Sequence, residues 1–354
     1  MSNPLGPDFA RALLRWYRVH KRSLPWRQTR DPYGIWISEI MLQQTTVGAV
    51  IPYYRRWLKA FPDIASLARA RLQKVLKAWQ GLGYYQRARN LHAAAKIFAA
   101  EFRGKIPGDF ETLIEIPGFG PYTTAAVLSL AYNEPHPVLD ANVRRVMMRI
   151  SALPGRANGR HDGRILARLR VLIPKKSAGS FNQAMMEVGA LVCKSRNPRC
   201  LACPVLAFCL AFERGEQEVI PLPRERSVRR VSAVVGIIEE GGRYFIQKRP
   251  PSGLLAGLWE FPGGKVKSGE GLVKALAREI KEELGAEVAA ADFLIKVEHF
   301  YTTNHVTLRA YRIRLKGRPR MTRGVHKWVA PGNFNKYPFP SGSAKIIRFL
   351  ENKS

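Results

Sequence analysis

The stretch Cys193-x6-Cys200-x2-Cys203-x5-Cys209 contains every cysteine of this 354-residue chain. Because no other cysteine is available for a disulfide framework, we expect the four thiolates to act as one ligand set, for a structural zinc ion or an iron–sulfur cluster. Zinc sites more often pair two short C-x-x-C segments, and only one such segment is present. The wide, narrow, wide spacing therefore favours an iron–sulfur cubane, and disulfide pairing is the weakest alternative.

The composition indicates a partner with many negative charges. The formal net charge is +31 and the isoelectric point is near 10.5, far from the values of a neutral soluble enzyme. Such an excess favours binding to polyanions, although charge alone does not distinguish DNA, RNA and an acidic membrane surface. No apolar stretch is long enough to span a bilayer and the N-terminus has no apolar signal region, so we expect a reducing intracellular compartment and no membrane partner.

The first part of the chain, residues 1–215, has the pattern of a helical domain. Glycine and proline breakers such as Pro52, Gly81-Leu82-Gly83 and Pro107-Gly108 are expected to divide its helices. Apolar residues recur at helical spacing in five segments: Ile35–Val50, Leu72–Trp79, Ala88–Phe102, Tyr122–Tyr132 and Asn142–Ile150.

The second part, residues 230–354, has the pattern of an α+β domain. Residues 216–229 contain two prolines and mixed charges without periodicity, which predicts a linker. The β-rich runs Val231–Ile238 and Arg243–Gln247, separated by Gly241-Gly242, predict a hairpin. A helix at Gly271–Leu284 and a strand pair around Phe293–Phe300 and Val306–Leu315 are expected to follow.

A tight glycine turn in Leu113–Thr124 predicts two helices joined by a hairpin. Gly118 and Gly120 permit a sharp turn and a close approach of the backbone to a ligand, and Pro121 suits the first position of the second helix. The exposed amides at the start of that helix would suit a DNA phosphate. A plain hairpin in a helical protein is the alternative.

Asp140 directly precedes another amphipathic segment, in which Val143 and Val146 share a face. It is an ideal N-cap residue for that helix. Capping and catalysis are compatible, because one carboxylate oxygen can accept from the helix amides while the other faces a substrate cation.

The hairpin, a downstream aspartate and the cysteine loop occur in this order in the helix–hairpin–helix DNA glycosylases, whose cysteine loop carries a 4Fe–4S cluster. The whole chain closely resembles the adenine DNA glycosylases of the MutY family. The resemblance implies an all-α glycosylase domain with an iron–sulfur loop, followed by an α+β Nudix-like domain. It is carried by five segments: Leu24–Arg27, Ser38–Thr45, Gly81–Tyr85, Val138–Val146 and Phe181–Glu187.

The resemblance assigns catalytic roles to four residues. Glu39, among apolar neighbours that raise a carboxyl pKa, would protonate the adenine, and Asp140 would stabilise or trap the sugar cation. Tyr122 and Asn142 would orient these groups. Superfamily members that also cut the strand have a lysine where this chain has Tyr122, so the resemblance implies hydrolysis without β-elimination.

Further residues are implied in binding the extruded adenine and filling the gap that it leaves. Unstacking a base costs a few kcal/mol, which contacts of this kind offset. The adenine pocket would be lined by Trp26, Arg27, Leu42, Val47 and Glu187, and the vacated stack would be filled or wedged by Gln43, Gln44 and Tyr84.

The second domain contains the charged and glycine positions of a Nudix box. Glu279, Glu282 and Glu283 lie on one helix face and could hold magnesium, although a salt-bridged surface helix is the alternative. By the resemblance this domain recognises 8-oxoguanine opposite the adenine, and the family's Phe-Ser-His loop falls at Tyr301-Thr302-Thr303, where Thr302 could supply a hydroxyl. The box reads Gly264-x5-Glu270-x7-Arg278-Glu279-Ile280-Lys281-Glu282-Glu283-Leu284-Gly285.

The resemblance therefore implies a monomeric, cytoplasmic and nucleoid-associated enzyme. Its partner would be double-stranded DNA with 8-oxoguanine:adenine or guanine:adenine mispairs. Two alternatives remain: a glycosylase for another mispaired base, such as thymine opposite guanine, and a nucleotide pyrophosphohydrolase tethered to a DNA-binding helical domain.

Overall fold

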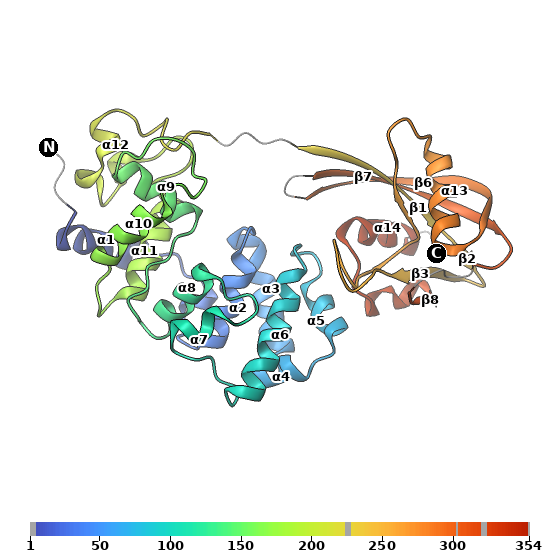
Figure 1. Cartoon of the computed structure of the whole chain (residues 1–354), viewed down its shortest axis with the longest axis horizontal. Helices are drawn as coiled ribbons and strands as arrows, with labels where there is room; N and C mark the ends of the chain where they lie inside the picture. The colour runs from blue at the N-terminus through green and yellow to red at the C-terminus, as the bar shows by residue number, and fades with distance from the viewer. Residues whose placement is uncertain (1–4, 224–227, 302–303, 320–323, 353–354) are drawn as a thin grey trace. The chain divides into compact units, whose positions relative to one another are not determined.

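The computed structural model describes residues 5–223, 228–301, 304–319 and 324–352. The chain forms two compact units (Figure 1), which are described separately. Unit 1 comprises Met1–Arg69 and Asn90–Glu225, and unit 2 comprises Ala70–Arg89 and Arg226–Ser354. A short segment from the first quarter of the chain therefore groups with its C-terminal part.

The described residues of unit 1 form helices joined by loops, as the sequence predicts, with one isolated β-bridge between Arg156 and Leu222. Its α-helices are α1 (Pro7–His20), α2 (Pro32–Leu42), α3 (Val47–Ala60), α4 (Ile64–Arg69), most of α6 (Gln86–Glu101), α7 (Phe110–Ile114), α8 (Pro121–Ala131), α9 (Ala141–Ile150), α10 (Asp162–Leu172), α11 (Ala178–Leu191) and α12 (Leu210–Glu213). Its short 3-10 helices are η1 (Pro25–Arg27), η2 (Cys200–Ala202) and η3 (Leu206–Phe208).

One core of unit 1 forms where α11 packs against α1, α8 and α9. Phe9, Met147 and Phe181 are fully buried there. Gly189 allows α9 and α11 to approach closely, because a Cβ atom at Gly189 would lie only 2.6 Å from the Cβ of Asn142. Close packing of this kind tolerates little added volume, so the start of α9 is held firmly in place.

Two local predictions in this unit are wrong. The helix expected at Ile35–Val50 is interrupted between α2 and α3, where Gln44 has a left-handed φ of 56°. Pro52 does not end a helix but lies inside α3. Val50, Tyr54 and Trp57 of α3 are all buried, and this packing offsets the backbone hydrogen bond that proline cannot donate.

Unit 2 is α+β and begins with α5 (Leu72–Trp79) and the first residues of α6. Among its described residues, one sheet has the strand order β5-β1-β7-β6, and the other has the order β2-β3-β4 with β8 also paired to β3. The strands are β1 (Arg229–Ile237), β2 (Glu239–Glu240), β3 (Arg243–Lys248), β4 (Trp259–Glu260), β5 (Gly263–Lys265), β6 (Glu287–Tyr301), β7 (Asn304–Lys316) and β8 (His326–Val329). The helices that follow β5 and β8 are α13 (Leu272–Leu284), η4 (Pro331–Lys336) and α14 (Ser341–Glu351).

Both long helices of the C-terminal part bury an apolar face. Leu276 and Ile280 of α13 pack with Val234 of β1 in one core. Ile346 of α14 belongs to a second core, which also contains Trp259 of β4 and Phe339. The predicted helix at Gly271–Leu284 is thus confirmed, with Gly271 as its N-cap residue.

The predicted hairpin at Gly241-Gly242 is correct only for its tip. Both glycines have positive φ, and β2 pairs with β3 across them. However, β1 pairs in parallel with β7 and antiparallel with β5, in the other sheet. The two β-rich runs of the predicted hairpin therefore belong to different sheets, β1 to one and β3 to the other. This pairing depends on distant strands, which local pattern does not encode.

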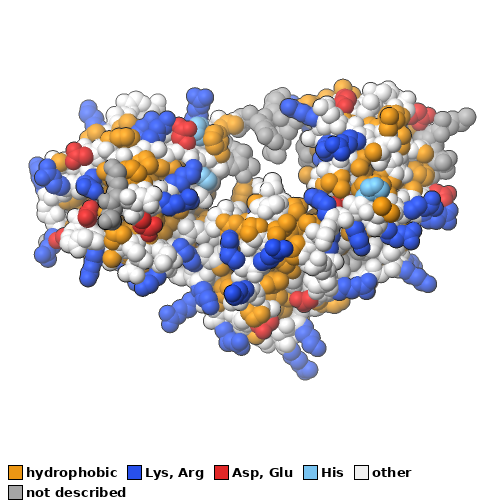
Figure 2. Space-filling model, turned by 180° about the vertical axis from the view of Figure 1, so that it is seen from behind, with side chains coloured by type: hydrophobic (Ala, Val, Ile, Leu, Met, Phe, Trp, Pro, Cys, Tyr) orange, Lys and Arg blue, Asp and Glu red, His pale blue; other side chains and the backbone are white. Residues whose placement is uncertain are grey.

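The surface of both units is rich in basic side chains. Figure 2 shows Lys and Arg over much of the displayed face and fewer Asp and Glu, as expected from the net charge of +31. Among the residues that the structure describes, no helix combines the length and apolar character needed to cross a membrane.

Candidate active site

Glu39 is a carboxyl group buried inside the helical unit. It lies on α2, where Tyr33–Met41 are all buried, and Tyr122 in the first turn of α8 donates its hydroxyl to Glu39 Oε2 at 2.7 Å. Burial raises the pKa of Glu39 to about 7, and although the Tyr122 hydrogen bond lowers it, desolvation is the larger effect. A carboxyl group with this pKa can hold a proton near neutral pH and donate it.

Asp140 is the N-cap residue of α9, as predicted. Its Oδ1 accepts from the Val143 amide at 2.6 Å, and its Oδ2 accepts from Asn142 Nδ2 at 3.1 Å. Burial raises the pKa of Asp140, whereas these hydrogen bonds and the charge of Arg145 oppose the rise. Asp140 also raises the pKa of Glu39 by its charge, so the two carboxyl groups belong to one electrostatic site.

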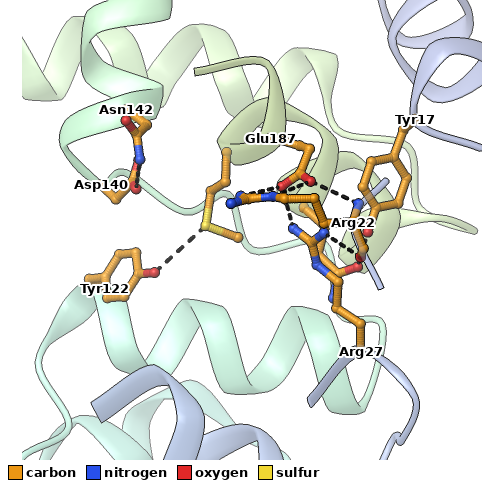
Figure 3. A network of polar contacts seen from close by, with 9 residues as sticks. Tyr17, Arg22, Arg27, Tyr122, Asp140, Asn142 and Glu187 are labelled. Atoms are coloured by element: carbon orange, nitrogen blue, oxygen red, sulfur yellow. Dashed lines mark hydrogen bonds and ion pairs between the residues drawn. The ribbon is translucent and has the colours of Figure 1, made fainter. Parts of the chain in front are cut away.

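Arg145 fixes the orientation of the Asn142 side chain. Its Nη2 donates to Asn142 Oδ1 at 2.9 Å and to the Gly189 carbonyl at 2.7 Å, while its Nε donates to the Cys193 carbonyl at 2.8 Å. Asn142 therefore has a fixed orientation toward Asp140, which Figure 3 shows.

Glu187 on α11 forms the centre of a buried ion cluster (Figure 3). Arg22 donates to it through its backbone amide, Nε and Nη2 at 2.8–2.9 Å, and Arg27 Nη2 donates at 2.7 Å. Burial alone would raise the pKa of Glu187, but the hydrogen bonds from both arginines outweigh it and hold this pKa at about 2. Glu187 is therefore a carboxylate at all ordinary pH values.

Arg22 is a site residue that the sequence reasoning missed. It lies in a basic run, His20-Lys21-Arg22, which reads as solvated surface. Its position just before the Leu24–Arg27 segment was the available signal. Its pairing with Glu187, far away in the sequence, becomes visible only in the fold.

The other predicted pocket residues lie in the N-terminal part of unit 1, between η1 and the start of α3. Trp26 is buried and packs edge-on against Tyr54, with ring centroids 5.4 Å apart. Leu42 and Val47 are half-buried at the ends of α2 and α3. Between them, Gln43 donates to Thr123 Oγ1 at 3.3 Å, and Gln44 is exposed.

Tyr84 belongs to unit 2 and is 43% exposed. It follows the Gly81-Leu82-Gly83 turn and has a left-handed φ of 47°. The predicted wedge residue is thus presented by a constrained turn.

The predicted helix–hairpin–helix is present in unit 1. Its helices are α7 and α8, and Gly118 between them has a φ of 88°. A Cβ atom at Gly118 would lie 3.0 Å from Asn90 Cβ, so the turn needs glycine for space as well as conformation. Gly120 is the N-cap residue of α8 and Pro121 its first residue, which leaves the amides of that turn for an anion.

The four cysteines all lie half-buried in the loop that carries η2 and η3. Arg149, a buried side chain of α9, donates to Cys193 Sγ at 3.2 Å. Burial, together with the charges of the other three cysteines, raises the pKa of Cys203 to about 12. Four half-buried thiols in one loop, with a buried guanidinium beside Cys193, are the kind of donor set that an iron–sulfur cluster requires.

No metal site is preformed in the part of the chain that the structure describes, because no three His, Cys, Asp or Glu side chains there are arranged to hold an ion. The expected magnesium site on α13 accordingly has no support from ligand geometry. Arg278 donates to Glu279 at 2.8 Å and lies 3.5 Å from Glu282, while Glu283 accepts from Gln247 and the Gly263 amide.

Comparison with protein families matches both parts of the chain. Residues 37–175 match the HhH-GPD superfamily of base excision DNA repair proteins, and residues 233–349 match the NUDIX domain family.

Individual relatives and solved structures are similar to most of the chain or to its helical part. The adenine DNA glycosylase of Buchnera aphidicola subsp. Schizaphis graminum is 36% identical over 272 residues, which cover 75% of this chain and 78% of the relative. The Homo sapiens adenine DNA glycosylase is 32% identical, with coverage of 98% and 74%. A thermostable thymine-DNA glycosylase structure is 28% identical with a TM-score of 0.53, covering 58% of this chain and 95% of that one. An endonuclease III–DNA complex, 22% identical with a TM-score of 0.51 over 58% of this chain and 94% of that one, shares the fold.

The pKa of Glu39 leads to a prediction about stability. Its folded pKa, about 7, exceeds its unfolded value, so protonated Glu39 contributes stability below about pH 4.5 that is lost as the pH rises to about 7. The free energy of unfolding of the parent protein should fall relative to that of Glu39→Gln across this interval, by up to about 3 kcal/mol. Urea unfolding at a series of pH values measures it.

Glu101→Gln, at the exposed end of α6, is the matched control and should run parallel to the parent. Parallel curves for the parent and Glu39→Gln would show that Glu39 titrates as an ordinary exposed carboxyl group.

Proposed function

Because this chain belongs to the adenine DNA glycosylase family of base excision repair, we propose that it removes adenine paired with 8-oxoguanine or guanine and leaves the strand uncut. The observation that carries the chemistry is a pair of carboxyl groups in one electrostatic site: buried Glu39 on α2, which accepts from the Tyr122 hydroxyl, and half-buried Asp140 at the N-cap of α9. The basic surface supports double-stranded DNA as the partner.

The proposed reaction begins with proton transfer from Glu39 to a ring nitrogen of the extruded adenine. The bond from the sugar C1′ to the base then breaks, and its electron pair leaves with the protonated adenine. Adenine is a poor leaving group without this proton, so the raised pKa of Glu39 is what the step requires.

Asp140 is proposed to stabilise the cationic sugar that remains. One of its oxygens is occupied by the Val143 amide, and the other, aligned by Asn142, is the one that would face C1′. Asp140 would either balance the charge or form a covalent ester that water hydrolyses. In both cases water supplies the oxygen at C1′ and loses one proton, which the Glu39 carboxylate left by the first step can accept.

The absence of a lysine at position 122 supports hydrolysis without strand cleavage. Tyr122 is half-buried, and desolvation together with the nearby carboxylates raises its pKa well above 10, so it remains a phenol that donates to Glu39. A phenol cannot form the Schiff base that β-elimination needs.

The ion cluster at Glu187 is proposed to shape the pocket for the adenine. Both carboxylate oxygens of Glu187 are taken by Arg22 and Arg27, so the role we assign to Glu187 is to fix these guanidinium groups. Trp26 would supply an aromatic surface and Arg27 polar contacts, with Leu42 and Val47 as apolar contacts. Gln43, Gln44 and Tyr84 would occupy the stack that the adenine leaves.

Lesion reading is proposed for unit 2. Thr302, the residue expected to supply a hydroxyl to 8-oxoguanine, lies outside the described residues. We propose that discrimination between the lesion and guanine depends on contacts of unit 2 with the base opposite the adenine.

The central test is single-turnover base release from duplexes with adenine opposite 8-oxoguanine, guanine, cytosine or thymine. Release should occur with the first two, and strand breaks should appear only after alkali. Glu39→Gln and Asp140→Asn should each slow release by about 10²-fold or more while duplex affinity stays near the parental value. Parental turnover in either variant would refute the proposed mechanism.

Borohydride provides an independent check on the strand chemistry. No amine adduct with DNA should be trapped, because position 122 lacks an amine. Efficient trapping, or cleavage without alkali, would instead indicate a bifunctional glycosylase.

We further propose that Cys193, Cys200, Cys203 and Cys209 hold a 4Fe–4S cluster. When bound, the cluster would stabilise the loop that follows α11. Purified protein should be brown and contain about four iron atoms per chain, and Cys200→Ser should lower iron content and DNA affinity without altering the pH profile of base release. Stoichiometric zinc without iron in anaerobically prepared protein would contradict the assignment.

A second candidate activity, hydrolysis of a nucleoside triphosphate, is favoured by the glycine loop before α13. A Cβ atom at Gly264 would lie 2.4 Å from the Glu279 carboxylate, so glycine is needed for that group to approach the loop. Glu279, Glu282 and Glu283 would hold magnesium, which would stabilise charge on the phosphates.

The full chain with magnesium and ordinary or 8-oxo triphosphates tests this activity. Pyrophosphate release should appear and should be lost in Glu282→Gln but not in Glu240→Gln, an exposed control on β2. No release at enzyme concentrations comparable with substrate would leave unit 2 as a recognition module.

A further inference from the structure

The segment that presents Tyr84 is built onto the α+β core of unit 2. Ala70–Arg89 precedes residues 226–354 by a long stretch of chain, yet it groups with them. It contains α5, the glycine turn and Tyr84, and α5 is labelled in Figure 1. The contacts that anchor it are specific polar ones.

Polar residues at helical spacing lie along α5 and at its C-cap position: Gln73 and Lys77 in the helix and Gln80 at the cap. Gln73 Nε2 donates to the Gly257 carbonyl at 3.1 Å, and its Oε1 accepts from Trp259 Nε1 at 3.1 Å. Both ends of this amide are therefore satisfied by groups next to or within β4.

The second anchor lies one turn further along α5. Lys77 Nζ donates to the Tyr337 carbonyl at 3.1 Å and to Gln80 Oε1 at 2.9 Å. Beyond the glycine turn, the Tyr85 hydroxyl donates to the Phe339 carbonyl at 3.2 Å. Hydrogen bonds to the C-terminal part of unit 2 therefore hold the segment Ala70–Arg89 in place on both sides of Tyr84.

The groups that Gln73, Lys77 and Tyr85 bind belong to, or lie next to, residues packed in the core of unit 2. Trp259 and Phe339 are buried members of one core, and Trp259 packs edge-on against Tyr337 with ring centroids 5.1 Å apart. Side chains locked by packing position their partners far better than mobile loop residues do.

Side chains at the C-terminal end of α5 and in the first turn of α6 hold the Gly81-Leu82-Gly83 turn in place. Trp79 Nε1 donates to the Gly83 carbonyl at 2.9 Å, and Arg87 Nη2 donates to the Leu82 carbonyl at 3.0 Å and to the Gly83 carbonyl at 3.2 Å. Tyr84 follows with its left-handed φ of 47°, a conformation that persists only when its surroundings enforce it. A continuous path of hydrogen bonds and packed rings therefore joins β4 to the Tyr84 backbone.

We propose that Gln73 and Trp259 are positioning residues for Tyr84. Through these two residues, the α+β part of unit 2, which would bind the lesion strand, fixes the orientation of the side chain that enters the base stack. This inference rests on the proposed function, because it requires Tyr84 to act as the wedge. The ligand is an unstacked base step in duplex DNA. Ordinary packing between α5 and β4 would stabilise the fold but would leave base unstacking unchanged.

Trp259→Phe tests the inference, because it keeps an aromatic ring in the core and removes the donor to Gln73. It also removes part of the buried ring volume, so a second Trp→Phe change is needed as a control for lost packing. A duplex with adenine opposite 8-oxoguanine and 2-aminopurine beside the lesion reports unstacking by fluorescence, in an Asp140→Asn background that prevents turnover. The fluorescence rise should fall in Trp259→Phe, and single-turnover release in the catalytically intact protein should slow by about two- to tenfold.

Trp328→Phe is the matched control. Trp328 lies on β8, packs edge-on against Phe245 and contributes to the other core of unit 2. It should unstack DNA as the parent does. Equal losses in both tryptophan variants would mean that general loosening of the domain is the cause, and the inference would be overturned.

Gln73→Met should cause at least the same loss, because it removes the bond to Trp259 and the bond to the Gly257 carbonyl. The double variant Gln73→Met/Trp259→Phe should be no worse than Gln73→Met alone, because the bond to Trp259 is already absent there. Tyr84→Ala distinguishes the wedge role of Tyr84 from the positioning role of Gln73 and Trp259. If Tyr84→Ala unstacks normally, the wedge role fails and this inference fails with it. If Tyr84→Ala abolishes unstacking while Trp259→Phe behaves like the parent, only the positioning role is refuted.

Discussion

The proposed chemistry of the helical unit depends on the burial of one ionisable carboxyl group. Glu39 lies in a helix whose neighbouring residues are all buried, and its pKa near 7 follows mainly from desolvation. The packing of α2 against α8 brings Tyr122 to this group, and the close approach of α9 and α11 at Gly189 fixes Asn142 beside Asp140. The stability of the core and the chemistry of the site therefore share the same contacts.

A comparison of the buried carboxyl groups shows how partners decide protonation. Glu187 and Glu39 are both almost completely buried. Glu187 is bound by the two guanidinium groups of Arg22 and Arg27 and has a pKa of about 2, whereas Glu39 accepts from a neutral phenol and has a pKa of about 7. Full positive charges outweigh the desolvation penalty and a neutral donor does not. One buried residue is thus suited to fix cations and the other to deliver a proton.

Local pattern predicted the parts of this structure that local physics determines. The order of the helices, the glycine hairpin, Asp140 as an N-cap residue and a raised pKa for Glu39 all follow from neighbouring residues. The features that it missed depend on distant partners: Arg22 is recruited by Glu187 on α11, and β1 pairs with β7 rather than β3. The break at Gln44 also escaped detection, because nothing in the apolar spacing of 35–50 marks a left-handed residue. The grouping of Ala70–Arg89 with unit 2 likewise depends on hydrogen bonds between residues that are far apart in the sequence.

The most direct test of the account is the titration of Glu39 itself, followed by carbon-13 NMR of glutamate-labelled protein with Glu39→Gln used to assign its carboxyl signal. We predict a midpoint of about 7, which should move upward in Tyr122→Phe because the lost hydrogen bond stabilises the carboxylate form. A midpoint near 4.5, the value of an unperturbed glutamate carboxyl, would contradict the claim that burial keeps Glu39 protonated for catalysis.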